Sequence, residues 1–188
     1  MFPAYCFHCE ERLEKVQQRL CAGCKEQLLL LKSEGRCLKC FGQIETLSGV
    51  CHSCRKTSHA HKRAAACFEK VGAAASLHRQ FAQGRLFLAK DLAALMILQL
   101  EQLNWPEPTL VTHVPLPLEE RLWQGFDPSK ELASLLGKWM NVPTKKALLK
   151  NEIVLLIEDR MSQLFSHAET LLESAPAAIY GLAFLAQD

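Results

Sequence analysis

The chain has 188 residues, 49% of them hydrophobic and 22% charged, and a formal net charge of +2. This length accommodates one ordinary domain and a small module, with enough apolar residues to bury a sizeable core. No apolar run reaches the roughly 18 residues that a membrane-spanning helix needs. The N-terminus lacks the basic start and apolar stretch of a secretory signal, so we expect a cytoplasmic protein.

Four Cys-x-x-Cys pairs lie in the first third of the chain and contain eight of its nine cysteines. They are Cys6 and Cys9, Cys21 and Cys24, Cys37 and Cys40, and Cys51 and Cys54. Two thiolates separated by two residues can hold one tetrahedral metal ion from a tight turn, and two such pairs complete a four-sulfur site. The pattern predicts two structural zinc ions, without which this segment does not fold.

Alternatives to this arrangement stay open. Four thiolates also suit iron–sulfur clusters, although the even, ribbon-like spacing favours zinc, and a reducing cytosol disfavours disulfides. We expect sequential pairing, in which the first two pairs share one ion and the last two share the other, rather than a cross-braced pairing. Leu13, Val16 and Leu20 recur at helical spacing and predict a short helix within residues 10–20.

The two parts of the chain differ in charge. Residues 1–66 carry 11 Lys/Arg and 6 Asp/Glu, a balance of +5, whereas residues 67–188 carry 11 and 14, a balance of −3. A basic module can bind nucleic acid. However, each four-thiolate zinc site has a net charge of −2, which reduces the excess to about +1. A local basic cluster remains, which could contact nucleic acid or form a solvated linker: Arg55, Lys56, Lys62 and Arg63.

Strand-like and helix-like segments alternate after residue 63. Strands are predicted over 64–71, 109–114, 153–157 and 179–186, and helices over 73–83, 86–103, 128–140 and 162–174. Asp127 followed by Pro128 is a typical helix start, and Cys67 is predicted to be a small buried hydrophobe in the first strand. This alternation predicts an α/β domain with a parallel sheet. The predicted organisation is a double zinc ribbon over 1–57, a basic linker over 58–63 and the α/β domain over 64–188.

Glu158 and Asp159 directly follow a strand of the buried type and precede a helix. Ligands of parallel sheets bind beyond the carboxyl ends of the strands, where carboxylates hold sugar hydroxyls or magnesium. Carboxylates also favour the N-terminal end of a helix for electrostatic reasons alone. Both interpretations of this pair stay open.

Three stretches resemble the ComF/GntX family, which joins a double zinc ribbon to a type I phosphoribosyltransferase-like domain. They are the eight-cysteine module, the run from Val114-Pro115-Leu116 through Gln124-Gly125-Phe126 to Glu131-Leu132-Ala133, and the segment from Val154 to Asp159. The third resembles the strand and acidic pair that open the family's phosphoribosyl pyrophosphate loop. The resemblance covers nearly the whole chain and implies a small parallel-sheet phosphoribosyltransferase-like domain.

The resemblance implies a remnant substrate-binding loop at Glu158, Asp159, Ser162 and Ser166. In the family, a Thr-Thr-Gly-x-Thr type loop follows the acidic pair and cradles the 5′-phosphate at a helix N-terminus. Here Leu164 stands at the glycine position, with Phe165 beside it. A leucine resists positive φ and puts a branched side chain where the phosphate would lie.

Cationic groups of the family are missing as well. Gln124 and Gln80 stand where the family has arginine and lysine, Asp127 replaces an asparagine, and the polar flap segment before Glu158 is shortened. Cationic groups stabilise a leaving pyrophosphate. Three lysines could supply charge nearby or form a solvated surface: Lys145, Lys146 and Lys150.

These departures favour a ComF-like protein of competence and DNA uptake, whose inactive phosphoribosyltransferase-like domain acts by binding or scaffolding. The resemblance implies single-stranded DNA and a competence helicase as partners. One alternative is an active transferase that uses phosphoribosyl pyrophosphate with magnesium, holding ribose hydroxyls with Glu158 and Asp159 and phosphate with Ser162 and Ser166. Another is a zinc-ribbon module that binds nucleic acid through the basic cluster. No catalytic residue is identified, and magnesium is expected only if the transferase is active.

Overall fold

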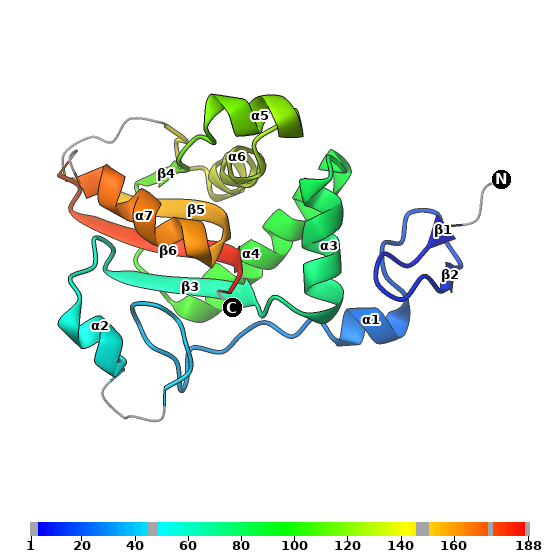
Figure 1. The fold of residues 1–188 in the computed structure, drawn as a ribbon, viewed down its shortest axis with the longest axis horizontal. Helices are drawn as coiled ribbons and strands as arrows, with labels where there is room; N and C mark the ends of the chain where they lie inside the picture. Colours follow the sequence, from blue (N-terminus) through cyan, green and yellow to red (C-terminus); the bar gives the residue numbers. More distant parts are fainter. Residues whose placement is uncertain (1–3, 45–48, 146–150, 173–174, 187–188) are drawn as a thin grey trace.

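The computed structural model describes residues 4–44, 49–145, 151–172 and 175–186. Two cysteine modules precede an α/β domain, as the sequence predicts (Figure 1). The elements are β1 Ala4–Tyr5, β2 Arg12–Leu13, α1 Ala22–Glu26, α2 His52–Lys56, β3 Arg63–Phe68, α3 Gly72–Ala82, the 3-10 helix η1 Leu86–Leu88, α4 Ala89–Leu103, β4 Leu110–Thr112, α5 Leu118–Gln124, α6 Pro128–Met140, β5 Ile153–Arg160, α7 Met161–Leu171 and β6 Ala178–Leu185.

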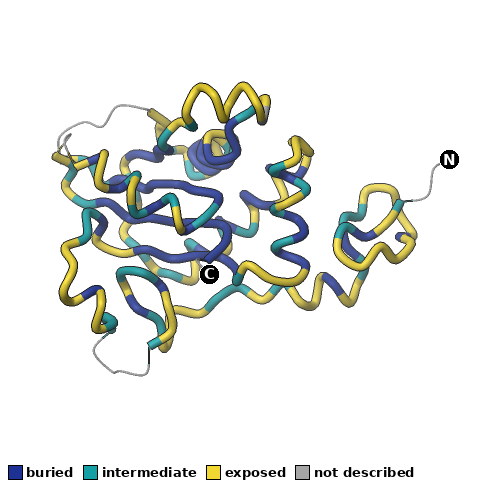
Figure 2. The backbone as a smooth tube through the Cα atoms, in the orientation of Figure 1, coloured by how far each residue is buried: buried dark blue, intermediate teal, exposed yellow. Residues whose placement is uncertain are grey.

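A four-stranded sheet with the order β3-β6-β5-β4 forms the centre of the α/β domain, and all its neighbouring strands are parallel. The predicted parallel sheet is therefore confirmed. Its strands are buried on both faces, which explains why they are continuous apolar runs in the sequence. Figure 2 shows this burial concentrated in the sheet, whereas the N-terminal cysteine module is largely exposed.

Helices cover both faces of the sheet (Figure 1). Along β6, Phe184 stacks on His78 of α3 and Tyr180 lies against Trp105, which follows α4. The Cβ position of Gly181 faces the opposite side of the sheet, because side chains alternate along a strand. A Cβ atom at Gly181 would lie 2.5 Å from Cδ2 of Leu164 in α7. α3 and α4 therefore cover one face, together with α6, which packs on α4, and α7 covers the other.

The helix predicted within residues 10–20 is wrong. Arg12–Leu13 forms β2, which pairs antiparallel with β1 in the register Ala4 to Leu13. Leu13 and Leu20 are buried, but Val16 is 62% exposed. The apolar residues therefore fill the small core of the first cysteine module and do not form a helical stripe. A hairpin forms here in place of a helix because its turn holds the first ligand pair, Cys6 and Cys9.

The cysteine modules attach to different parts of the α/β domain. In the first, His8 Nδ1 hydrogen-bonds Ser76 Oγ of α3 at 3.0 Å. The segment leading to the second lies along β3, with Leu31 N donating to Cys67 O at 2.9 Å, and Cys67 is a buried residue of that strand, as predicted. An edge strand exposes unpaired backbone groups. The second module and its connection therefore protect this edge of the sheet.

Asp127 caps α6 as the sequence predicts. Its Oδ1 accepts a hydrogen bond from Lys130 N at 3.0 Å, and Pro128 occupies the first turn. In contrast, α5 was not predicted from the sequence. Its side chains are mostly exposed, so it lacks the one-sided apolar pattern that identifies a packed helix.

The contact between Leu164 and Gly181 gives a prediction about stability. Leu164→Ala is expected to destabilise the zinc-loaded protein by about 2–5 kcal/mol, because it leaves a cavity in the core. Gly181→Ala is expected to cost about 1–3 kcal/mol through overpacking. The double variant should be more stable than the sum of the two costs implies, since the shortened side chain on α7 leaves room for the new methyl group on β6.

Urea unfolding of the full chain measures these free energies, with Leu172→Ala, at a residue 51% exposed, as the control of small effect. Strictly additive costs would show that the two residues do not share this space.

Candidate metal centres and buried acidic pair

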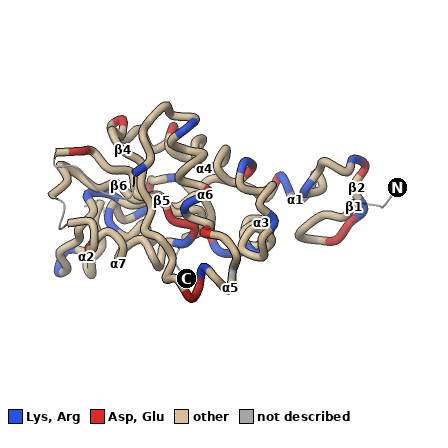
Figure 3. Tube along the Cα trace, turned by 90° about the horizontal axis from the view of Figure 1, so that it is seen from above, with Lys and Arg blue, Asp and Glu red and all other residues tan. Residues whose placement is uncertain are grey.

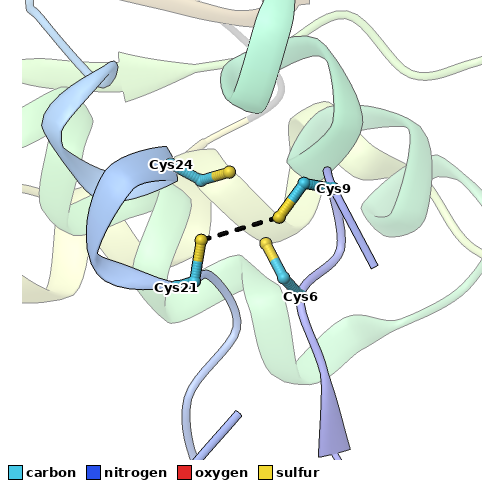
Figure 4. A group of neighbouring side chains, drawn as sticks. All are labelled: Cys6, Cys9, Cys21 and Cys24. Atoms are coloured by element: carbon cyan, nitrogen blue, oxygen red, sulfur yellow. Dashed lines mark hydrogen bonds between the residues drawn. The ribbon is translucent and has the colours of Figure 1, made fainter. Parts of the chain in front are cut away.

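The cysteine ligands form two groups of four. Cys6, Cys9, Cys21 and Cys24 make one group, and Cys37, Cys40, Cys51 and Cys54 make the other, with all sulfur atoms of a group within 4.8 Å of one another. The sequential pairing is confirmed. Figure 4 shows the first group, in which the four thiols point toward a common centre from the β1–β2 turn and the start of α1.

The sulfur spacing fits a tetrahedral metal site. Cys9 Sγ lies 3.6 Å from Cys21 Sγ, and Cys40 Sγ lies 3.8 Å from Cys51 Sγ. A tetrahedral zinc ion with Zn–S bonds of about 2.3 Å separates its ligands by about 3.8 Å. A disulfide would need a sulfur separation of about 2.05 Å, and all nine cysteines are free. The donor sets are therefore consistent with two structural metal ions and not with disulfides.

Backbone amides prepare the sulfur atoms for metal binding. Cys37 Sγ accepts hydrogen bonds from Lys39 N at 3.4 Å and from Cys51 N at 3.3 Å. Burial alone raises the pKa of Cys37, but the amide donors outweigh it and lower the pKa to about 6. The same balance lowers the pKa of Cys6 to about 6. Because metals bind the thiolate form, each group contains one ligand that is readily deprotonated.

The segment predicted as a basic linker, residues 58–63, is tied to the second cysteine group. His61 Nε2 donates to Lys39 O at 2.8 Å, and Lys39 Nζ donates to His61 O at 2.9 Å. Burial lowers the pKa of His61 to about 4, which keeps the ring neutral near neutral pH. Its ring also stacks on Phe165 of α7, with 5.3 Å between the ring centres. The reciprocal hydrogen bonds therefore join this segment to the cysteine module, and the ring stacking joins it to α7.

Glu158 and Asp159 lie within β5, which continues to Arg160. α7 begins at the next residue, Met161. The strand therefore passes directly into the helix. Glu158 is 1% exposed and Asp159 is 5% exposed. Burying two carboxylates is costly unless each has charged or hydrogen-bonding partners.

Partners for both carboxylates come from three helices. Glu158 accepts from Ser129 Oγ of α6 at 2.9 Å and from His167 Nδ1 of α7 at 2.6 Å. Asp159 accepts from His78 Nε2 of α3 at 2.8 Å. The Asp159 amide also donates to Ser129 Oγ at 3.2 Å. Figure 3 shows the acidic end of β5 near the middle of the domain.

The pKa values of the two acids are shifted in opposite directions. Burial raises the pKa of Glu158 in spite of its hydrogen bonds from His167 and Ser129. Burial also acts to raise the pKa of Asp159, but the hydrogen bond and charge of His78, with the charge of Arg160, outweigh it and lower that pKa. The hydrogen bond to Glu158 raises the pKa of His167. The carboxylates are thus balanced by this chain's own side chains.

Sequence reasoning missed Ser129, His78 and His167. All three stand in ordinary helical segments. Ser129 is 29 residues from Glu158 in the sequence, and His78 is 81 residues from Asp159. The one available signal was physical: two acids predicted at a buried strand end require donors, and serine and histidine on the flanking helices can supply them.

The other residues of the predicted substrate loop lie inside α7. Ser162 is exposed, and the hydroxyl of Ser166 donates to Gln163 O at 3.0 Å within the helix. Leu164 is buried against Gly181. The structure therefore brings Glu158 and Asp159 together but does not form a loop with the two serines. Lys145 is exposed, and Lys146 and Lys150 lie outside the described residues.

The predicted basic cluster is exposed. Arg55 and Lys56 end α2, and Lys62 and Arg63 lie at the start of β3. Arg55 Nε donates to Val50 O at 3.1 Å, so this guanidinium is partly engaged. The cluster flanks the second cysteine group along the chain.

A cavity of about 550 Å³ opens beside the carboxyl end of β4. His113, Arg121, Asp127 and Lys130 are among its lining residues, whereas Glu158 and Asp159 are not. His113 Nε2 lies 3.9 Å from Asp127 Oδ2. The cavity that opens here is therefore separate from the acidic pair.

The chain matches no protein-family model, no curated protein and no solved structure. Among the helices that the structure describes, none has the length and apolar character to cross a membrane. What is established is a chain with two zinc-ribbon-like tetracysteine clusters followed by an α/β domain with a four-stranded parallel sheet.

Metal content tests the cysteine clusters. The purified protein is expected to contain two zinc ions per chain by elemental analysis, and Cys54→Ser should retain one, because a closed site needs all four thiolates. Cys67→Ala is the matched control, since Cys67 belongs to neither group, and should retain two. Two ions retained in Cys54→Ser would contradict the assignment.

The His167–Glu158 pair gives a pH dependence. The pKa of His167 is raised above its ordinary value of 6.5. Its contribution to stability is therefore fully present below pH 6.5 and is lost as the pH rises through the folded-state pKa. His167→Gln keeps a hydrogen-bond donor but does not titrate, so the decline that His167 contributes should be absent from the unfolding free energies of this variant. Any decline that remains comes from Glu158, whose pKa is also raised.

The quantity to compare is the difference in unfolding free energy between wild type and variant at each pH from 6.5 to about 9. Taking this difference removes the effect of metal affinity, which changes with pH in both proteins. His52→Gln, at an exposed histidine of α2, should follow the wild type. Parallel profiles for wild type and His167→Gln would show that the pair does not titrate as proposed.

Proposed function

We propose that this chain is a divergent ComF/GntX-like protein whose phosphoribosyltransferase-like domain does not turn over phosphoribosyl pyrophosphate. It acts by binding or scaffolding, with two zinc ions that stabilise its N-terminal modules. The observation that carries this proposal is the direct passage of β5 into α7 at Arg160 and Met161. That junction leaves no loop to cradle a 5′-phosphate.

The engagement of the acidic pair supports the same conclusion. A carboxylate that holds ribose hydroxyls or magnesium must present its oxygen atoms to the ligand. Here the oxygens of Glu158 accept from Ser129 and His167, and one oxygen of Asp159 accepts from His78. A sugar would have to displace these partners and separate α3, α6 and α7 from the strand.

The position of Leu164 also supports a non-catalytic domain. Its side chain is fully buried and fills the space over Gly181 between α7 and the sheet. It is therefore part of the packing that fixes α7 in place. Restoring glycine at this position would remove that packing and also weaken the helix, since glycine costs about 1 kcal/mol relative to alanine in a helix interior.

A role in DNA uptake, with single-stranded DNA and a helicase as partners, follows from the family resemblance. The exposure of Arg55, Lys56, Lys62 and Arg63 is compatible with phosphate contacts. A binding role of this kind leaves the carboxyl end of the sheet without a catalytic task.

Calorimetry tests the proposal on the zinc-loaded full chain. Phosphoribosyl pyrophosphate with magnesium is expected to give no saturable heat, because the acidic pair is engaged internally and no phosphate loop is present between β5 and α7. A single-stranded oligonucleotide is expected to bind with an affinity that falls as salt rises. Replacing the four basic residues by alanine should weaken this binding and flatten its salt dependence.

Saturable, magnesium-dependent binding of phosphoribosyl pyrophosphate that Asp159→Asn abolishes would overturn the proposal and favour the active transferase. The matched control for the basic cluster is the replacement of Lys25 and Lys32, which also lie in the N-terminal part. Oligonucleotide binding that the four replacements leave unchanged would show that the basic cluster does not bind DNA.

A further inference from the structure

A second cavity lies toward the amino ends of the strands, at the end of the sheet opposite the acidic pair. Its volume is about 270 Å³, and Trp105, Tyr180, Met140 and Leu155 are among its lining residues. Leu155 and Tyr180 are neighbours in the register of β5 and β6, each the third residue of its strand. The turn that joins α4 to β4, from Asn104 to Pro108, forms one side of the cavity.

This turn is rigid. Asn104 ends α4 in the left-handed conformation with a φ of 46°, and Pro106 and Pro108 fix two of the next four residues. The ring of Trp105 lies against that of Tyr180, with centres 5.3 Å apart and planes inclined by 46°. Tyr180 is buried and supports the half-buried indole of Trp105. The indole is therefore held in place before a ligand binds, which lowers the entropic cost of binding.

The electrostatic features of the cavity all favour a positive charge. Glu101 and Glu107 line it and are exposed. The C-terminal end of α4, a helix of 15 residues, also meets it, and the last carbonyl groups of a helix carry a partial negative charge. Pro106 and Pro108 have no N–H to donate to those carbonyls.

Among the described residues that line this cavity, none is a lysine, arginine or histidine. Arg36 and Arg63 instead line a separate cavity of about 60 Å³ that shares Trp105. Among the described residues, no cation therefore shares the lining of the larger cavity with the two glutamates.

We propose that this cavity binds a small organic cation with an apolar body, of the alkylammonium or alkylguanidinium class. The indole face of Trp105 attracts such cations through its quadrupole. The half-buried side chains of Leu100 and Met140 accommodate the alkyl part, and the two carboxylates balance the charge. The volume accommodates one head group with a short chain. This site is independent of the proposed function, because it uses no residue of the acidic pair or of the basic cluster.

The fluorescence of Trp105 reports binding to the zinc-loaded full chain. The protein has three tryptophans, so a Trp123→Phe, Trp139→Phe background leaves Trp105 as the one indole. Choline and agmatine are expected to change its emission saturably. 3,3-Dimethylbutan-1-ol, the uncharged analogue of choline, should bind about tenfold more weakly, because it lacks the cation–π and carboxylate interactions.

Variants separate the two parts of the site. Glu101→Gln with Glu107→Gln should weaken choline binding about tenfold and leave the neutral analogue unchanged. The matched control, Glu119→Gln with Glu120→Gln on α5, changes two exposed carboxylates outside the cavity and should have no effect. Trp105→Leu, followed by calorimetry, should abolish binding while urea unfolding shows that the protein remains folded.

A free alkylguanidinium and an arginine side chain of a partner protein present the same cationic group to this cavity. Agmatine and a blocked arginine amide distinguish the sources, since tighter binding of the blocked residue indicates a protein partner and tighter binding of agmatine a free metabolite. Equal affinity for choline and its neutral analogue would overturn the proposal. So would the absence of saturable binding by either cation, or choline binding that survives the Glu101 and Glu107 replacements unchanged.

Discussion

Two buried carboxylates at the end of β5 are the constraint on which the arrangement of the α/β domain depends. Burying Glu158 and Asp159 costs several kcal/mol for each ion unless it has partners, and the partners come from α3, α6 and α7. Because the two side chains point to opposite faces of the strand, they tie helices on both faces of the sheet to one point. Removing one partner would leave a buried charge uncompensated, so these contacts position the helices as well as satisfying the acids.

The two cysteine clusters lie outside the sheet, the first against α3 and the second along β3. Each contains one five-residue helix. The first adds the short β1–β2 hairpin and the second an isolated bridge between Arg36 and Gln43, and these elements are too short to be stable in water by themselves. Metal binding therefore supplies much of their folding free energy. The second cluster and its connection lie along β3 through hydrogen bonds at Cys67 and Ala64. Loss of its metal is consequently expected to expose the edge of the sheet.

The two ends of the sheet differ in what they offer a ligand. Parallel sheets usually bind ligands beyond the carboxyl ends of their strands, but here the acids at that end are satisfied by the chain's own side chains. Toward the amino ends, Trp105 and Tyr180 line a cavity whose glutamates are not balanced by a lining cation in the described residues.

Local spacing determined what the sequence could predict. The Cys-x-x-Cys pairs, the alternation of apolar strands with helices, and the Asp127-Pro128 helix start each depend on residues within a few positions of one another, so both metal groups and the parallel sheet were predictable. The apolar spacing of Leu13, Val16 and Leu20 misled because the ligand pair imposes a hairpin. Only the tertiary structure decided that Glu158 and Asp159 are balanced by His78, Ser129 and His167, because charge compensation depends on which helices meet a strand end, and spacing along the chain does not specify that.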